Sequence, residues 1–266
     1  MQTNYKITGN EISQANLAVD GYELVRGAFP PSLVAAALDE VIAAIRSDPP
    51  AAHPNVGAYV SNDLHIVRES KVLDSAAAHP EHFVSRVFNC HTTGACMTLA
   101  KSPVIVQRVV EVLGKNVDCF QSQCIFKSPG AIGQQWHQDS YYLPFDNKPQ
   151  IGVWIALTDA HLDNSCLWVL PGSQVEHVHE HVADRRSAAN AGYVEIVDRD
   201  FRAAKALVVQ QGDAVFFHSH LMHKSSDNTS QERRASLVLH YARSETKMLS
   251  PDPVLAKLTR WISVAP

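Results

Sequence analysis

The stretch Gly212-Asp213-Ala214-Val215-Phe216-Phe217-His218-Ser219-His220-Leu221-Met222-His223 combines a turn, an apolar run and three histidines. Gly-Asp is typical of a turn, and the apolar residues after it are typical of a buried strand. Regular alternation would place His223 on the same face as Phe217, with His218 and His220 on the opposite face. We therefore expect His223 to point inward, although the three histidines compete for this role.

Similar short apolar runs follow one another from about residue 117 onward, and Pro, Gly, Asn and Asp residues separate them. This texture is typical of antiparallel strands joined by turns. It predicts a barrel or a jelly roll, and periodicity alone does not exclude a plain sandwich. The expected strands are 150–157, 166–170, 204–209, 214–220 and 235–241.

Two amphipathic helices are expected before these strands. One covers 31–46 and begins with a proline, and the other has Ser102 at its N-cap and Gly114 after its last turn. The segment 79–89 is a candidate for a third helix. We therefore predict one domain that is mainly β with some α. It covers residues 1–266, with a helical part at about 1–116 that supports a β core at about 117–245.

The chain has 266 residues, of which 45% are hydrophobic and 19% charged, and its net charge is -4. This composition is typical of a globular protein, and it lacks the basic excess that nucleic-acid binding requires. We find neither a signal peptide nor an apolar run long enough to span a membrane, so we expect a cytoplasmic protein with no nucleic-acid and no membrane partner. Five cysteines without a Cys-x-x-Cys pair predict free thiols. The sequence leaves the oligomeric state open.

His137 and Asp139 stand two positions apart, so in a strand both side chains would point to the same face and could chelate one cation. Together with His223 they would offer two imidazoles and one carboxylate. This set matches the facial arrangement of a non-haem Fe(II) oxygenase, whereas zinc would be expected to draw more His or Cys. The alternative is that His137 and Asp139 form a surface pair and the later histidines are solvated.

Arg234 and Ser236 follow His223 after eleven positions and open another apolar run. Strand alternation would place them on one face together with Val238 and His240. A guanidinium beside a hydroxyl is suited to binding a carboxylate. This second feature favours the metal site over the surface pair.

These residues resemble the phytanoyl-CoA dioxygenase family of Fe(II)- and 2-oxoglutarate-dependent oxygenases. The resemblance covers most of the chain. One departure is Ser165, where the family turn Asn-Gly-x-Leu-x-x-x-Pro-Gly-[ST] has Gly, and we expect it to alter only backbone freedom. The segments that carry the resemblance are Asp20 to Gly27, His137-Gln138-Asp139, Asn164 to Ser173, Gly212 to His223, Asn228, Arg234 and Tyr241.

The resemblance implies a double-stranded β-helix, the cupin-like jelly roll, with a catalytic iron centre. The implied iron ligands are His137, Asp139 and His223. The resemblance further implies that Arg234, helped by Ser236, binds the distal carboxylate of 2-oxoglutarate. Trp154 matches a position that lines the co-substrate pocket, and Lys127 is a weaker candidate for the same anion.

The implied reaction uses O2 and converts 2-oxoglutarate to succinate and CO2 while a C–H bond of a small molecule is hydroxylated. Related halogenases lack the metal carboxylate, so the presence of Asp139 disfavours halogenation. Family membership does not choose among acyl-CoA thioesters, amino-acid derivatives, phosphonates and natural-product intermediates as substrates. Two alternatives are a non-catalytic jelly-roll protein that binds or senses metal, and a cupin-like metal enzyme that does not use 2-oxoglutarate.

The alternating histidines His177, His179 and His181 follow a Pro-Gly turn and have other residues between them. We expect them to form a solvated strand edge or lid edge rather than a second metal site. Tyr141 and Tyr142 follow the His137-x-Asp139 motif and fit either a pocket wall or ordinary core packing.

Overall fold

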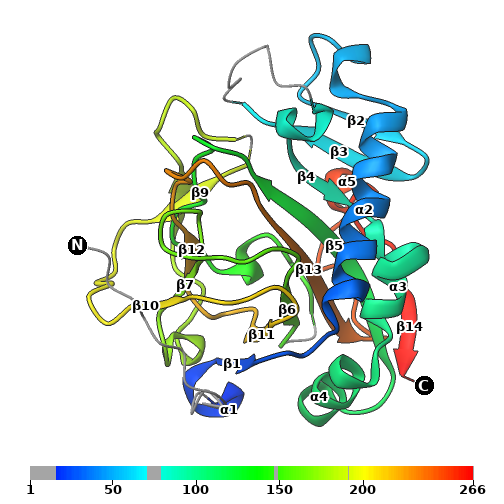
Figure 1. Ribbon diagram of the computed structural model, residues 1–266. Coiled ribbons are helices and arrows are strands. Elements are labelled where there is room, and N and C mark those ends of the chain that lie inside the picture. The colour runs from blue at the N-terminus through cyan, green and yellow to red at the C-terminus, as the bar shows by residue number, and fades with distance from the viewer. Residues whose placement is uncertain (1–15, 71–78, 147–148, 191, 266) are drawn as a thin grey trace.

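A large antiparallel sheet forms the centre of the structure, a computed structural model that describes residues 16–70, 79–146, 149–190 and 192–265 (Figure 1). Its strands follow the order β1-β11-β6-β13-β5-β4-β3-β2, and β14 also pairs with β5. The two longest strands, β5 and β13, pair along most of their length and carry residues of the site. The strands are β1 (Tyr22–Val25), β2 (Ala58–Ser61), β3 (Leu64–Arg68), β4 (Val84–Phe88), β5 (Val117–Lys127), β6 (Ile151–Ala156), β11 (Ala214–His218), β13 (Arg234–Arg243) and β14 (Ile262–Ala265).

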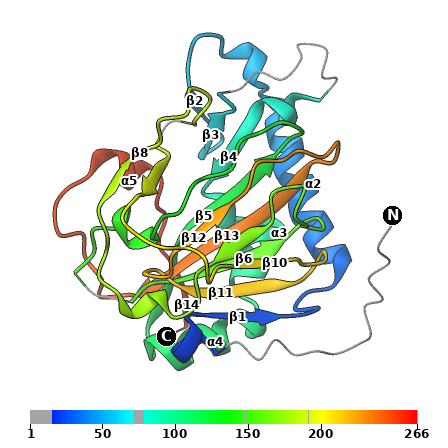
Figure 2. The ribbon, with the colours of Figure 1, turned by 90° about the vertical axis from the view of Figure 1, so that its left-hand side faces the viewer.

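A smaller antiparallel sheet of order β10-β7-β12 faces one side of the large sheet, and the pair β8-β9 lies beside it (Figures 1 and 2). Leu167 of β7 shares one apolar cluster with Trp154 of β6 and Val238 of β13. The two facing sheets form a jelly-roll core, as predicted. The smaller strands are β7 (Leu167–Val169), β8 (His181–Ala183), β9 (Val194–Ile196), β10 (Lys205–Leu207) and β12 (His223–Ser225).

Helices cover the opposite face of the large sheet (Figure 1). The two predicted amphipathic helices are confirmed as α2 (Pro31–Ser47) and α4 (Pro103–Leu113), and each begins with a proline. Gly114 ends α4 with a positive φ of 84°, a backbone conformation that glycine adopts readily. The other helical segments are α1 (Leu17–Asp20), α3 (Gly94–Ala100), α5 (Pro253–Lys257), η1 (Pro50–Ala52), η2 (Pro80–Phe83), η3 (Cys90–Thr92), η4 (Asp139–Tyr141) and η5 (Ser173–Val175).

The helix expected at 79–89 was wrong. This segment forms the short turn η2 and then β4, whose Val-Ser-Arg-Val-Phe sequence pairs with both β3 and β5. The part expected to be helical, about 1–116, therefore also contains the four strands β1 to β4. β-branched and aromatic residues favour a strand here because neighbouring strands are available on both sides.

The five expected strands are present with slightly shorter bounds, as β6, β7, β10, β11 and a longer β13. Cysteines are buried free thiols, as predicted, at positions 90, 96, 119, 124 and 166. Within the described ranges, no helix has both the length and the apolar character that a bilayer crossing requires.

Candidate metal centre and its cavity

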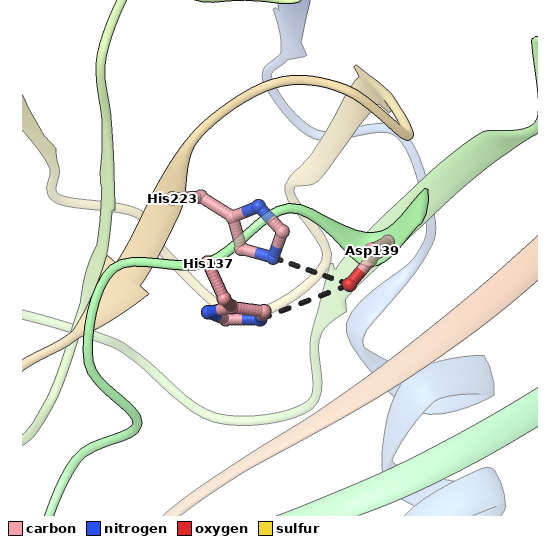
Figure 3. A group of neighbouring side chains, drawn as sticks. All are labelled: His137, Asp139 and His223. Atoms are coloured by element: carbon pink, nitrogen blue, oxygen red, sulfur yellow. Dashed lines mark ion pairs between the residues drawn. The ribbon is translucent and has the colours of Figure 1, made fainter. Parts of the chain in front are cut away.

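His137, Asp139 and His223 lie together between the two sheets (Figure 3). Each offers one ligand atom, and these atoms lie within 4.8 Å of one another. Oδ1 of Asp139 is 3.7 Å from Nε2 of His137 and 3.6 Å from Nε2 of His223. The three side chains therefore converge on one point, as a mononuclear metal site requires.

The backbone that presents these ligands is not the regular strand that the sequence predicted for His137 and Asp139. His137 and His223 form an isolated bridge, in which each backbone N–H donates to the carbonyl of the other residue at 3.0 Å. Asp139 begins the 3-10 turn η4. Strand β11 ends at His218, and a turn intervenes before His223 opens β12. The prediction thus named the converging residues but assigned the wrong local geometry to them.

Backbone carbonyls orient both imidazoles. Nδ1 of His137 is 2.8 Å from the Gln135 carbonyl, and Nδ1 of His223 is 2.9 Å from the Leu221 carbonyl. A carbonyl oxygen only accepts, so each Nδ1 carries the proton and donates it, which leaves the Nε2 lone pair free towards Asp139. Burial, together with the neighbouring His223, lowers the pKa of His137 to about 3. This imidazole is therefore neutral at neutral pH, the form that binds metal.

Asp139 is held in its ionised form by His223 and by a further histidine, His240. Burial alone would raise the pKa of Asp139, but His223 and a hydrogen bond from His240 outweigh burial and lower that pKa. Nε2 of the buried His240 donates to Oδ2 of Asp139 at 3.0 Å. Oδ2 is thereby engaged, whereas Oδ1 faces the two metal-site imidazoles.

Arg234 begins β13 and is buried. Its Nε and Nη2 donate to the Ser165 carbonyl at 3.0 and 2.7 Å, and Nη1 donates to Ser236 Oγ at 3.0 Å. Its guanidinium carbon lies 5.7 Å from the centre of the Trp154 ring. Burial lowers the pKa of Arg234 to about 10, so the side chain is still a cation at neutral pH. Arg234, Ser236 and Trp154 thus form one cluster, as the alternation on β13 predicted for the first two.

Ser165 was expected to alter only backbone freedom, and this expectation was wrong because Ser165 also contacts Arg234. Its φ of 77° is in the left-handed region, where the related turn has Gly. Its hydroxyl donates to the Ser226 carbonyl and accepts from Nη2 of Arg234 at 3.2 Å. Ser165 therefore helps to orient the guanidinium through its carbonyl and its hydroxyl.

A cavity of about 600 Å³ joins the two clusters. The three metal-site residues and Arg234 line the same cavity. A volume in this range is typical of sites for small molecules. The cavity therefore has room for an anion on Arg234 and for a second small molecule near the metal-site residues.

The model of the phytanoyl-CoA dioxygenase (PhyH) family matches residues 17–236. The chain belongs to the PhyH family. It is 30% identical over 180 residues to the phytanoyl-CoA dioxygenase domain-containing protein 1 of Bos taurus, covering 65% of this chain and 59% of the relative. It is 27% identical over 189 residues to the peroxisomal phytanoyl-CoA dioxygenase of Homo sapiens, covering 68% of this chain and 56% of the relative. The chain spans about half to three fifths of the length of the curated relatives it matches.

Solved structures with the same fold include members of several reaction types. A non-heme monooxygenase, ThoJ, superposes with a TM-score of 0.68 at 18% identity, covering 94% of this chain and 82% of that one. The epimerase SnoN, in complex with Fe3+, alpha ketoglutarate and nogalamycin RO, has a TM-score of 0.62 at 19% identity, covering 91% and 86%. These likenesses confirm the fold of this PhyH chain.

Gln138, the middle residue of the motif in this PhyH chain, connects the metal centre to the segment 177–181. Its backbone N–H donates to Nε2 of His181 at 3.0 Å, and its side-chain carbonyl accepts from the His179 N–H at 2.8 Å. His179 and His181 are therefore buried, which corrects the expectation of a solvated edge, and only His177 is exposed. Alternation would place all three histidines on one side of an extended segment, so it did not distinguish the exposed His177 from the two buried ones.

Lys127 lies opposite Arg234 in the β5–β13 ladder, but its ammonium is already engaged. It donates to the Ile132 carbonyl at 2.6 Å and to the Tyr193 hydroxyl at 2.8 Å. Burial raises the pKa of Tyr193, but the cations Lys127 and Arg86 outweigh burial and lower that pKa to about 7. Tyr193 was not among the predicted site residues, since a single tyrosine in a loop carries no pattern.

Proposed function

We propose that this chain is an Fe(II)- and 2-oxoglutarate-dependent dioxygenase that hydroxylates a C–H bond of a small molecule. The observation that carries the proposal is one cavity lined both by the His137, Asp139 and His223 cluster and by the buried Arg234. Two imidazole nitrogens and one carboxylate oxygen fit Fe(II) and leave its remaining coordination positions for other ligands.

The iron would be held by Nε2 of His137, Nε2 of His223 and Oδ1 of Asp139. When bound, the iron and 2-oxoglutarate supply the oxidation of R–H by O2, with R–OH, succinate and CO2 as products. Hydrogen bonds from the two Nδ1 atoms to backbone carbonyls fix the tautomer and the rotation of both imidazoles, so that each Nε2 faces the metal. His240 keeps Oδ2 of Asp139 engaged, so that Oδ1 is directed at the metal.

The distal carboxylate of 2-oxoglutarate would be bound by Arg234, with Ser236 beside it. Ser165 and Ser236 fix the plane of the guanidinium before the anion arrives, which reduces the entropy lost on binding. Trp154 supplies the apolar wall beside the guanidinium. Lys127 contributes positive charge to the same cavity, although its hydrogen bonds go to Tyr193 and Ile132.

The experiment combines metal and 2-oxoglutarate under anaerobic conditions. Wild-type protein with Fe(II) and 2-oxoglutarate is expected to show a weak visible charge-transfer band, and Arg234→Ala is expected to lack it at the same 2-oxoglutarate concentration. Arg202→Ala is the matched control, because this exposed arginine is paired with Asp200 and does not line the cavity as the structure describes it. A full-strength band in Arg234→Ala would contradict the assignment of Arg234.

Turnover tests the metal ligands separately. Under air, wild-type protein is expected to form succinate, and His137→Ala and Asp139→Ala are expected to form none. Succinate formation by either variant contradicts the proposed ligand set. O2 consumption that does not depend on 2-oxoglutarate would favour the cupin-like alternative, and metal binding without any succinate formation would favour the non-catalytic one.

A further inference from the structure

One wall of the cavity is the inner face of the large sheet, and His65 of β3 lies on it. His65 is opposite Phe88 of β4, which is opposite Gln123 of β5. Gln123 is in turn opposite Val238 of β13. Directly opposed residues point to the same face of a sheet, and all four of these side chains line the cavity.

His65 is remote from the proposed co-substrate cluster. Three strand spacings separate β3 from β13, about 14 Å, and four residues separate Val238 from Arg234, about 13 Å along the strand. In a flat sheet these two separations place His65 roughly 19 Å from Arg234. His65 therefore lies in the part of the cavity that is left for a second small molecule.

The cations of the cavity wall are engaged away from His65. Lys127 donates to the Tyr193 hydroxyl at 2.8 Å, and the guanidinium carbon of Arg86 lies 5.0 Å from the centre of the same ring. Arg234 is bound to its serine partners, and Lys224 belongs to β12 in the smaller sheet. The cations thus gather on the side of the cavity that faces Tyr193 and the smaller sheet.

The wall beside His65 is largely apolar. The Phe88 ring meets the imidazole edge to face, with ring centres 6.1 Å apart. The segment α5 lies against the end of β4, because Nδ2 of Asn89 donates to the Lys257 carbonyl at 3.1 Å. Leu255 in α5 and Leu258 just after it line the cavity.

Asp252 is the one carboxylate besides Asp139 on the described cavity wall. Its Oδ1 accepts from the Val254 and Leu255 N–H groups at 2.8 and 3.0 Å. Asp252 therefore caps α5, and its charge is stabilised by the first turn of that helix.

The imidazole of His65 has unused hydrogen-bonding capacity. Its Nδ1 is buried, and among the described residues neither ring nitrogen has a hydrogen-bond partner. Gln121 and Gln123 on the same wall, by contrast, are hydrogen-bonded to each other at 3.1 Å. Burial, together with the charge of Lys257, lowers the pKa of His65, so the ring is neutral at neutral pH. A neutral imidazole offers one donor and one acceptor, and a buried polar atom without a partner is costly unless a ligand supplies one.

We propose that the primary substrate is an uncharged, largely apolar small molecule and that His65 binds a hydroxyl group of this substrate. The inference rests on the proposed function. A hydroxyl both donates and accepts, so it fits a neutral imidazole in either tautomer, whereas a carbonyl only accepts and an ammonium only donates. The apolar body follows from Phe88, Leu255 and Leu258 on the same wall.

The experiment measures dissociation constants by ligand-detected NMR for four probes that share a phenyl ring: toluene, benzyl alcohol, acetophenone and benzylamine. Full-length protein is loaded with Zn(II), which is redox-inert, and saturated with 2-oxoglutarate. His65→Phe keeps an aromatic ring and removes both nitrogens. This variant is expected to bind benzyl alcohol about 3–10-fold more weakly than wild-type protein, the range typical of one neutral hydrogen bond. Its affinity for toluene is expected to be unchanged.

His161→Phe is the matched control, because His161 pairs with Glu232 at 3.3 Å and does not line the cavity as the structure describes it. It is expected to leave all four constants unchanged. His65→Gln, whose amide both donates and accepts, is expected to retain most of the affinity for benzyl alcohol.

The proposal is wrong if wild-type protein does not bind benzyl alcohol, or if His65→Phe binds it as tightly as wild-type protein does. It is also wrong if His65→Phe loses as much affinity for toluene. A loss for acetophenone or benzylamine at least as large as that for benzyl alcohol would overturn the hydroxyl in favour of a carbonyl or an amine.

Titration of 2-oxoglutarate separates this proposal from the proposed function. His65→Phe is expected to bind 2-oxoglutarate with wild-type affinity, which also shows that the variant is folded. A loss as large as that in Arg234→Ala would assign His65 to the co-substrate and overturn the proposal. If wild-type protein binds no 2-oxoglutarate, the proposed function fails, and the same four probes measured without co-substrate still decide whether His65 binds a hydroxyl.

Discussion

His240 shows how one residue outside the ligand set can shape the metal centre, because its Nε2–H engages the oxygen of Asp139 that does not face the imidazoles. We predict that His240→Leu lowers metal affinity about 10–100-fold, the usual effect of removing a hydrogen-bond partner of a metal ligand. His240→Gln, whose side-chain amide can donate in the same place, should retain most of the affinity. Competitive metal titration measures both. Equal losses in the two variants would show that His240 acts only through packing.

Tyr193 lies on the cavity wall outside the ligand set, and its ionisation depends on pH. Its pKa of about 7 lies below the ordinary value of 10.0 because Lys127 and Arg86 outweigh the effect of burial. We predict a tyrosinate absorbance step with a midpoint near pH 7 in the ultraviolet, which Tyr193→Phe should lack. Tyr142→Phe is the control, because burial raises the pKa of Tyr142 and its phenol should not contribute to this step.

The same shift predicts a change in stability. Since the pKa is lowered on folding, the ionised phenol stabilises the folded state above pH 7, and this contribution grows until the unfolded tyrosine also ionises near pH 10. Urea unfolding of wild-type protein and Tyr193→Phe at several pH values should show their difference in unfolding free energy rising over this interval. A difference that is constant with pH would contradict the assignment.

At the scale of elements, the loop before His137 depends on a close approach to the strand β12. A Cβ atom added at Gly133 would overlap the Ser225 carbonyl oxygen, while the Gly133 N–H donates to Asp227 at 2.7 Å. We predict that Gly133→Ala destabilises the protein by about 1–3 kcal/mol, as overpacking typically does, and weakens metal binding because the loop carries His137. Gly57→Ala is the control, since a Cβ there meets no atom within 4 Å. Equal unfolding free energies for the two variants would contradict the prediction.

The elements also show where local pattern is informative. Helices α2 and α4 could be predicted because their prolines and apolar stripes lie within one short window. The helix expected at 79–89 was wrong because β4 gains its stability from β3 and β5, whose residues are distant in the sequence. Local periodicity therefore could not predict strand β4, which carries Arg86.

For the whole molecule, Glu81 joins the helical layer to the start of β13. It is 1% exposed and pairs with Arg46 of α2 at 2.6 Å and with Arg233 at 3.1 Å. Burial raises its pKa, but the two arginines outweigh burial and lower the pKa from 4.5 to about 2. A lowered pKa stabilises the folded state at higher pH, so this contribution is lost as pH falls from about 4.5 to 2.

We predict that the unfolding free energy of Glu81→Gln decreases less than that of wild-type protein as pH falls from about 4.5 to 2. Urea unfolding at a series of pH values measures it. Glu111→Gln, on the exposed side of α4, should keep the wild-type profile. An unchanged acid profile in Glu81→Gln would contradict the role of this ion-pair network.

The single domain also stays a prediction at this scale. Strand β1 pairs with β11 and β14 pairs with β5, so segments near both ends of the described chain belong to one sheet. We predict one cooperative unfolding transition, with coincident curves from circular dichroism and tryptophan fluorescence. Separate transitions would show that the helical part and the jelly-roll core unfold independently.

Residue types and their short spacings were sufficient to predict a β-rich core, the His137-x-Asp139 pair and the placement of Arg234 and Ser236 on one face. The choice of His223 among three nearby histidines came from the family resemblance. The placement of Arg234 and Ser236 depends on neighbours in the chain, and alternation along β13 expresses it directly. Only the folded structure shows the 3-10 turn at Asp139, the burial of His181 and the positions of Arg86 and Tyr193 on the cavity wall. Each depends on contacts between segments far apart in sequence, and no local pattern encodes such contacts.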